Sequence, residues 1–267
     1  HDRVFMDTDW EADVTYEYLR GELTRVLGPI QEIRADLLME ELCAKRGMFP
    51  SRVRRFCTQE LKVFPMRDHL RALMDAGADV INTIGIRAAE SAPRAKMPEW
   101  EWQDTMDCEV WRPILRWSEQ DVIDIHRRHG LRPNPLYLLG ASRVGCWPCI
   151  YARKSEIALI ARVDPARIDR LEALEQRVAG AAEARYAKDG DTFASLGCAR
   201  PAWFQSRIPE WKNCETCGGT GRVGEEACPK CDGDGKVDAH KTWPIRKVVE
   251  WSRTARGGRQ LEMFTAL

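Results

Sequence analysis

The stretch ADVINTIGIRAAESAPR, residues 78–94, sets the expected fold of this chain. A helical pattern that ends at Gly77 precedes it, and the apolar run at its start predicts a strand. Arg87, Glu90 and Arg94 follow where that strand ends. Charged side chains placed directly after a buried strand are typical of the ligand-binding edge of an open α/β sheet.

Strands and helices also alternate upstream of this stretch. An apolar run that ends in Asp7 and Asp9 predicts a buried parallel strand, and a helical pattern over residues 14–26 follows it. A second strand is expected over residues 30–36 and a second helix over 37–47. This alternation predicts an α/β fold with a doubly wound, mostly parallel sheet.

Two further segments, after residues 118 and 164, have the pattern of helices. Ser118 and Asp121 have the spacing of a capping pair, and Asp164 followed by proline predicts another helix start. The helix after Asp164 carries an apolar stripe, which we interpret as core packing: Ile168, Leu171, Leu174 and Val178.

Composition excludes several classes of protein. Of 267 residues, 44% are hydrophobic and 31% charged, which is typical of a soluble globular protein, and no apolar run predicts a membrane span. The formal net charge is zero, so no overall attraction to nucleic acid is expected. Six of the ten cysteines form Cys-x-x-Cys pairs. Together with the lack of a visible signal peptide, this indicates metal binding in a reducing cytoplasm.

Two of these pairs lie close together near the C-terminus. Each has the pattern Cys-x-x-Cys-x-Gly-x-Gly, and the surrounding segment has few apolar residues with which to form a core. Four thiolates with no open position predict a structural zinc site. The ligands are Cys214, Cys217, Cys228 and Cys231. The motif resembles half of the zinc-binding region of DnaJ-type chaperones, which implies zinc but no chaperone activity.

Four cations between residues 62 and 143 are candidates for binding an anion. Arg87 and Arg94 lie at a predicted strand end, where guanidinium groups suit phosphate or sulfate oxygens. Lys62 and Arg143 are expected to add charge to the same ligand. Each alone would be interpreted as a surface cation, but together they favour an anionic ligand.

The order of the motifs resembles the phosphoadenosine phosphosulfate (PAPS) reductase family of the adenine-nucleotide α-hydrolase superfamily. The resemblance covers about residues 3–155. It rests on DTD at residues 7–9, CTQELKVFP at 57–65, GIRAAES at 85–91, WSEQDV at 117–122, and finally NPLY at 134–137 with GCWPC at 145–149. It implies an adenine nucleotide bound by Asp7, Asp9, Arg87, Glu90 and Arg94, with Lys62, Arg87 and Arg143 as catalytic cations, and magnesium on the phosphates.

Two reactions are compatible with this resemblance. The family's Ser-Gly-Gly-x-Asp-Ser phosphate loop is not in the sequence, and we expect it upstream of His1. The reductases' Glu-Cys-Gly-Leu-His segment is also not in the sequence, so our first hypothesis is ATP activation at the α-phosphate with sulfur transfer to an acceptor such as a nucleic acid. The alternatives are a PAPS or adenylylsulfate reductase that uses an external thiol, and a non-catalytic nucleotide- or nucleic-acid-binding module.

The remaining Cys-x-x-Cys pair suggests a different metal. Members of the family that hold a [4Fe–4S] cluster ligate it with cysteines at two places in the chain, and such clusters need four thiolates. The resemblance implies Cys57, Cys146, Cys149 and, as the preferred fourth ligand, Cys198, with Cys43 as second choice. Zinc or free thiols at Cys146 and Cys149 are the alternatives, and Cys108 is expected to be a buried hydrophobe. Such a cluster resembles the iron–sulfur relatives that thiolate DNA.

These hypotheses divide the chain into four parts. We expect a nucleotide-binding α/β domain over residues 1–155, a helical extension over 156–209, a zinc knuckle over 210–238 and a basic tail over 239–267. The knuckle and the tail are the expected contacts for a nucleic acid or a partner protein, and a homo-oligomer is left open.

Overall fold

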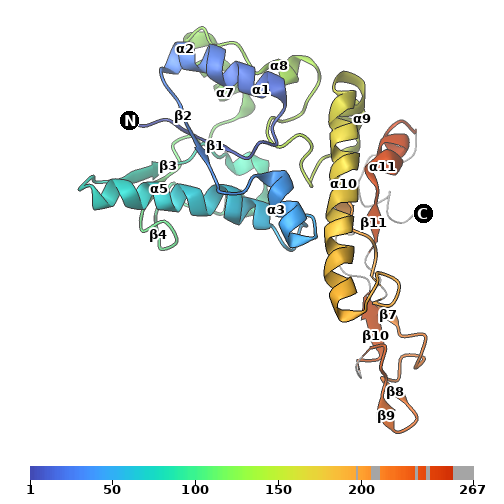
Figure 1. The fold of residues 1–267 in the computed structure, drawn as a ribbon. Helices are drawn as coiled ribbons and strands as arrows, with labels where there is room; N and C mark the ends of the chain where they lie inside the picture. The colour runs from blue at the N-terminus through green and yellow to red at the C-terminus, as the bar shows by residue number, and fades with distance from the viewer. Residues whose placement is uncertain (197, 206–210, 232–233, 239–240, 255–267) are drawn as a thin grey trace. The chain divides into compact units, whose positions relative to one another are not determined.

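The computed structural model describes residues 1–196, 198–205, 211–231, 234–238 and 241–254 and contains two compact units (Figure 1). Unit 1 consists of His1–Leu38 and Cys57–Val144, and unit 2 of Met39–Phe56 and the described residues from Gly145 onward. Residues 39–56, which we expected in the nucleotide-binding domain, therefore group with the C-terminal part. None of the described helices is long and apolar enough to span a bilayer.

The strands of unit 1 form two separate sheets. β1 (Val4–Asp7) pairs in parallel with β2 (Gln31–Arg34). β5 (Cys108–Trp111) lies between β3 (Ile81–Thr83), to which it is parallel, and β4 (Trp100–Gln103), to which it is antiparallel. The fold is thus mixed α/β with parallel strands as expected, but the described strands do not form one continuous doubly wound sheet.

The three-stranded sheet has one buried face. Val110 and Cys108 are 0% and 2% exposed, and Cys108 packs with Leu70 and Met106, as expected for a small buried hydrophobe. The other face carries Trp100 and Trp102 on β4, which are 46% and 59% exposed. This alternation follows from the period of two in a strand.

Helices of unit 1 follow the expected pattern with local changes. The first predicted helix consists of α1 (Asp13–Tyr18), a π-helical turn η1 (Leu19–Leu23) and α2 (Thr24–Leu27). The later segments are α4 (Phe56–Thr58), π-helical turn η2 (Gln59–Val63), α5 (Phe64–Asp75), η3 (Ala88–Glu90), α6 (Ala92–Ala95), α7 (Glu119–Arg128) and α8 (Pro135–Leu138). The predicted Ser118–Asp121 capping box at the start of α7 is confirmed.

Unit 2 is built on one long helix. α10 (Pro165–Tyr186) contacts α3 (Met39–Arg46), α9 (Lys154–Val163) and α11 (Ile245–Ser252), and Figure 1 shows α9, α10 and α11 near one another. Asp164 caps α10 as predicted. The predicted apolar stripe is core, because all four side chains are at most 2% exposed: Ile168, Leu171, Leu174 and Val178.

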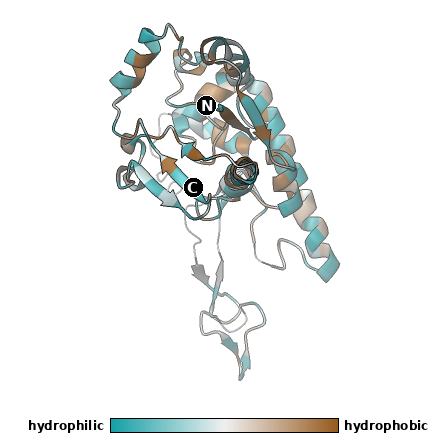
Figure 2. Cartoon of the chain, turned by 90° about the vertical axis from the view of Figure 1, so that its left-hand side faces the viewer, coloured by the Kyte–Doolittle hydropathy of each residue, from teal (hydrophilic) through white to brown (hydrophobic). Residues whose placement is uncertain are grey.

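Short elements complete unit 2. η4 (Ala187–Asp189) ends α10, and three antiparallel pairs follow. They are β6 (Phe204–Gln205) with β11 (Thr242–Trp243), β7 (Trp211–Asn213) with β10 (Lys236–Asp238), and β8 (Arg222–Val223) with β9 (Glu226–Ala227). Most of the segment that contains the last two pairs is teal to white in Figure 2, in keeping with its few apolar residues.

Candidate nucleotide site and metal centre

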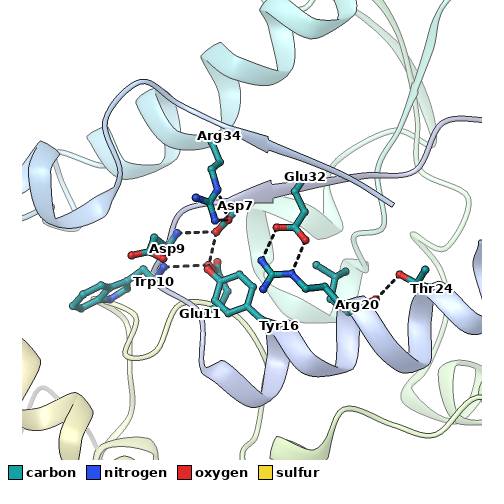
Figure 3. Close-up of polar contacts among 10 residues, drawn as sticks. Asp7, Asp9, Trp10, Glu11, Tyr16, Arg20, Thr24, Glu32 and Arg34 are labelled. Carbon is teal, nitrogen blue, oxygen red and sulfur yellow. Dashed lines mark hydrogen bonds and ion pairs between the residues drawn. The ribbon is translucent and has the colours of Figure 1, made fainter. Parts of the chain in front are cut away.

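The end of β1 holds a buried acid. Asp7 is 0% exposed, and its carboxylate accepts hydrogen bonds from Arg34 Nε at 2.7 Å and from the backbone N–H of Asp9 at 2.9 Å (Figure 3). The hydroxyl of Tyr16, from α1, lies 2.7 Å from the same carboxylate. The Asp7 carboxylate is therefore hydrogen-bonded entirely within unit 1, and these contacts fix the backbone at the end of β1.

A second buried carboxylate lies beside it. Glu11 is 2% exposed and accepts a hydrogen bond of 2.9 Å from the Thr8 hydroxyl, and Tyr16 Oη lies 3.0 Å from it. The predicted cation Lys62, in the π-helical turn η2, places its Nζ 3.9 Å from Glu11 Oε1. The structure therefore brings Lys62 to the carboxyl end of β1.

The hydrogen-bond partners of Asp7 determine its protonation state. Burial alone would raise the pKa of Asp7, but the hydrogen bonds from Tyr16, Asp9 and Arg34 outweigh it and hold that pKa below its usual value. Burial and the bond to Asp7 raise the pKa of the Tyr16 phenol. Asp7 is thus an anion at neutral pH and Tyr16 a neutral donor.

The loop after β3 is anchored to the chain that follows β5. Ile84 N–H donates to the Trp111 carbonyl at 2.9 Å, and Ala88 N–H donates to the Leu115 carbonyl at 2.7 Å. Arg87 lies between these anchors as the N-cap of η3. Its backbone is thereby fixed at the carboxyl end of a parallel strand, which is where ligands bind in open α/β sheets.

Glu90 connects the two predicted arginines of this loop. Its carboxylate forms an ion pair with Arg94 Nη1 and lies 3.8 Å from Arg87 Nε. The Arg87 side chain is only 18% exposed, and its Nη1 is buried with no hydrogen-bond partner among the described residues. An unsatisfied guanidinium N–H group is costly unless a ligand accepts from it.

The other predicted nucleotide-site residues are more open. Asp9 is half-buried and has a left-handed backbone with φ of 54°, while Arg143 is exposed in the loop before unit 2. Both belong to unit 1 together with Asp7, Lys62 and Arg87.

The four C-terminal cysteines form the one group of three or more metal-ligand side chains found in the described part of the chain. Their Sγ atoms all lie within 4.8 Å of one another, with 3.8 Å between Cys214 and Cys228 and 3.7 Å between Cys217 and Cys231. A tetrahedral ion with metal–sulfur bonds near 2.3 Å requires sulfur–sulfur distances of about 3.8 Å. The residues therefore fit a single tetrahedral metal ion; we call them the four-cysteine group.

Backbone N–H groups support the sulfurs of the four-cysteine group. Gly221 N–H donates to Cys217 Sγ at 3.3 Å and Gly235 N–H to Cys231 Sγ at 3.2 Å. Burial opposes ionisation of Cys217, but the N–H groups of Gly221 and Gly219 outweigh it and lower its pKa to about 6. Burial and the adjacent sulfurs raise the pKa of Cys231 to about 12. A bound cation would offset the repulsion between the negatively charged sulfurs and allow all four cysteines to be thiolates.

Glycine is required at Gly235. Its φ is 71°, and a Cβ atom there would lie 2.3 Å from the Gly219 carbonyl oxygen. The close approach brings the two Cys-x-x-Cys turns together, so the repeated glycines follow from the geometry of the four-cysteine group.

A family model for the phosphoadenosine phosphosulfate reductase domain matches residues 2–152, more than half of the chain. This chain belongs to the PAPS reductase family. The match includes β1, the loop with Arg87 and Glu90, and the Cys146–Cys149 pair, so it confirms the resemblance for the first half of the chain. The four-cysteine group lies outside it.

Relatives of two kinds are similar to this PAPS reductase-family chain. A protein from Escherichia phage 186, named as an uncharacterized 37.8 kDa protein in the gpa 5' region, is 45% identical over 312 residues, covering 98% of this chain and 84% of the relative. An adenosine 5'-phosphosulfate reductase of Allochromatium vinosum is 35% identical over 99 residues, 37% of this chain and 36% of the reductase. One of Rhodococcus opacus is 30% identical over 151 residues, 55% and 58% of the two chains. The chain spans less than two thirds of each reductase.

The predicted iron–sulfur ligands belong to both units. Cys57 is in unit 1, and Cys146, Cys149 and Cys198 are in unit 2. The Cys146–Cys149 loop is anchored by Trp147, whose indole Nε1–H donates to Asp164 at 3.0 Å. Cys198 follows α10, and its backbone N–H donates to the Phe193 carbonyl at 3.0 Å. Cys43 is buried in α3. The cluster and its fourth ligand stay predictions.

Several residues of the site were not predicted. Tyr16, Glu11 and Arg34 form the polar network around Asp7. Arg112, only 2% exposed, donates to the Pro98 carbonyl at 2.9 Å and lies in the segment after β5 to which the Arg87 loop is anchored. Glu11 lies in the acidic run after β1, a signal that could have identified it. Arg34 comes from another strand, and the packing of α1 brings Tyr16 to the Asp7 carboxylate, which a single sequence does not specify.

Proposed function

We propose that this chain binds a sulfonucleotide, an adenine nucleotide whose phosphate carries sulfate, and takes part in its reduction to sulfite. Two kinds of support converge on this reaction. The chain belongs to the PAPS reductase family, and curated relatives that match its first half are named adenosine 5'-phosphosulfate reductases.

The observation that carries the proposal is the unpartnered Nη1 of Arg87. This nitrogen is buried at the carboxyl end of β3, where Glu90 and two backbone hydrogen bonds fix the loop. A guanidinium held in this way keeps one N–H donor for a phosphate or sulfate oxygen, which a local movement of the loop on ligand binding would uncover. Lys62, Arg94 and Arg143 of the same unit supply further positive charge. Glu90 positions Arg94, Asp7 fixes the carboxyl end of β1 through its bonds to Arg34 and the Asp9 N–H, and Asp9 would bind the nucleoside.

The reaction balances with an external dithiol. A thiolate attacks the sulfate sulfur, the bond between that sulfur and the bridging oxygen breaks, and the adenosine phosphate leaves. A second thiolate then forms a disulfide with the first and releases sulfite, so that sulfur gains two electrons and the dithiol loses them. The cations named above would neutralise the charge that develops on the leaving phosphate.

Sulfite release tests the proposal. The full chain is incubated with sulfur-labelled adenylylsulfate or PAPS and a dithiol, and acid-volatile sulfite is counted. Arg87→Gln should reduce the rate at least about tenfold, whereas Arg127→Gln, on the exposed side of α7, should not. A folded chain that binds neither sulfonucleotide in calorimetry would contradict the proposal.

A second candidate is ATP-dependent sulfur transfer, with a nucleic acid as acceptor. Similarity to the phage relative covers 98% of this chain, whereas the family match ends at residue 152. The length that the two proteins share includes a C-terminal part that sulfonucleotide reduction alone does not explain. Pyrophosphate release from ATP and magnesium, without sulfite release, would select this reaction.

The metals proposed here have separate sites. The four-cysteine group fits zinc in a structural role, since four sulfurs leave no open position. The proposed iron–sulfur ligands are Cys57, Cys146, Cys149 and Cys198, of which the first three lie within the family match. Contacts to a nucleic acid or partner protein through residues 210–238 and the basic tail are also proposals, and Arg256 and Arg259 of that tail lie outside the described residues.

A further inference from the structure

Unit 2 holds a group of cations around one aromatic ring. The guanidinium carbons of Arg52 and Arg55 lie 5.0 and 5.5 Å from the centroid of the Tyr151 ring. Cation–π contact at these distances is favourable and fixes the direction of each guanidinium. None of these three residues belongs to the nucleotide site or the four-cysteine group.

A tight turn presents the two arginines. Ser51 N–H donates to the Arg54 carbonyl at 3.0 Å, and Arg54 N–H donates back to the Ser51 hydroxyl at 3.0 Å. Val53 at the tip is 71% exposed, and Arg54 and Arg55 are exposed. Because Tyr151 holds the Arg52 and Arg55 guanidinium groups, these two side chains lose little freedom when they bind a partner.

More positive charge follows Tyr151 in the chain. Arg153 is exposed and Lys154 begins α9, so the positive end of a ten-residue helix lies three residues from the tyrosine. Lys154 Nζ lies 4.8 Å from the Trp251 ring centroid and donates to the Thr254 carbonyl at 2.6 Å. The acid of this first turn, Glu156, is buried and accepts from the Arg153 N–H at 2.6 Å.

We infer that these residues form a binding surface for single-stranded nucleic acid: Arg52, Arg54, Arg55, Tyr151, Arg153 and Lys154, here called the Tyr151 cluster. Guanidinium groups bind phosphates through their N–H donors and stack on bases through their planes. Aromatic side chains combined with cations are typical of single-strand binding surfaces, whereas an acidic protein would require only the charges. The inference requires no step of the proposed reaction and goes beyond it.

Fluorescence anisotropy with a labelled oligothymidine of about 20 nucleotides tests the surface. Arg52→Gln/Arg55→Gln should bind at least about tenfold more weakly. Its slope of log affinity against log salt should fall by about 1.4, because two phosphate contacts are lost. The matched control is Arg25→Gln/Arg127→Gln, which removes the same charge from unit 1 at side chains 61% and 75% exposed. The control should bind within about twofold of the parent chain.

Further variants and a competitor distinguish a nucleic acid from an acidic protein as the partner. Tyr151→Phe should keep the affinity and Tyr151→Leu should lower it, since only the leucine removes the ring. Polyglutamate that displaces the oligonucleotide at equal charge concentration would overturn the inference in favour of an acidic protein. Equal binding by the double variant and its control would also overturn it. So would joint loss of oligonucleotide and sulfonucleotide binding in a double variant with an unchanged thermal midpoint, because the cluster would then serve the nucleotide site.

Discussion

Asp7 and Arg34 are register partners at the ends of the parallel strands β1 and β2, and their side chains form an ion pair of 2.5 Å. The two residues are 27 positions apart, so the contact exists only when the strands are paired in this register. Asp7 is 0% exposed and Arg34 half exposed, which leaves the acid dependent on its partner for solvation.

Arg34→Gln should therefore destabilise unit 1. The variant leaves a buried carboxylate with fewer charged partners, but solvent reaches the Arg34 side and screens the pair, so we expect a loss of about 1–3 kcal/mol in the free energy of unfolding. Urea unfolding at neutral pH measures it. Because the folded-state pKa of Asp7 is lowered, this stabilisation is present above about pH 4 and is lost as pH falls further. The parent and the variant should therefore converge in acid, and a gap that stays constant down to pH 2 would contradict the assignment.

Substitution of Glu90 tests whether its carboxylate positions Arg87 and Arg94 for binding the sulfonucleotide. Glu90→Gln removes the negative charge that forms an ion pair with Arg94 and attracts Arg87. The affinity for the sulfonucleotide should therefore fall by about threefold to tenfold, which is a smaller loss than in Arg87→Gln. Calorimetry measures the affinity, and Glu119→Gln at the exposed start of α7 is the control. Tighter binding by Glu90→Gln would mean that the carboxylate only repels the anion.

Glu175 should make the stability of unit 2 depend on pH. It lies on α10, and its carboxylate accepts from the N–H groups of Trp203 at 2.9 Å and Ile245 at 3.0 Å. Burial nevertheless raises its pKa to about 7, with the two N–H bonds opposing the rise. The stability it contributes is therefore complete below about pH 4.5 and is lost as pH rises through 7.

The comparison with Glu175→Gln isolates this effect, since glutamine keeps the acceptor oxygen and does not titrate. Relative to the variant, the parent should lose up to about 3 kcal/mol of unfolding free energy between pH 4.5 and 8. Thermal unfolding across this range provides the values. Parallel curves for the two proteins would show that the carboxyl group titrates normally.

The zinc ion and the iron–sulfur cluster that we propose should respond independently to substitution of their ligands. Cys217→Ser should release zinc, measured by chelator absorbance, and leave the visible absorbance of an anaerobically purified chain unchanged. Cys146→Ser should do the reverse, because the sulfurs of the four-cysteine group are within 4.8 Å of one another and need no ligand from elsewhere. Loss of zinc from Cys146→Ser would show that the sites are linked, and unchanged colour in that variant would remove the cluster.

What the sequence predicts depends on how local each feature is. The capping box of α7, the Asp164 cap of α10 and the four-cysteine group are specified by residues close in the chain, and all of them form as expected. The position of Arg87 at a strand end also follows from a local pattern. The Asp7 network does not, since Arg34 comes from another strand and Tyr16 is selected by the packing of α1. The π-helical turn that presents Lys62 has no clear sequence signature either.

The central claim is that the buried guanidinium of Arg87 binds the anionic group of a sulfonucleotide. Calorimetric titration of adenylylsulfate into the parent chain, Arg87→Gln and the exposed control Arg127→Gln tests it most directly. We predict that Arg87→Gln binds about ten- to a hundredfold more weakly, as expected for a lost hydrogen bond to a charged group, and that the control matches the parent. Equal affinity in all three proteins, with Arg87→Gln unfolding at the parental temperature, would contradict the account.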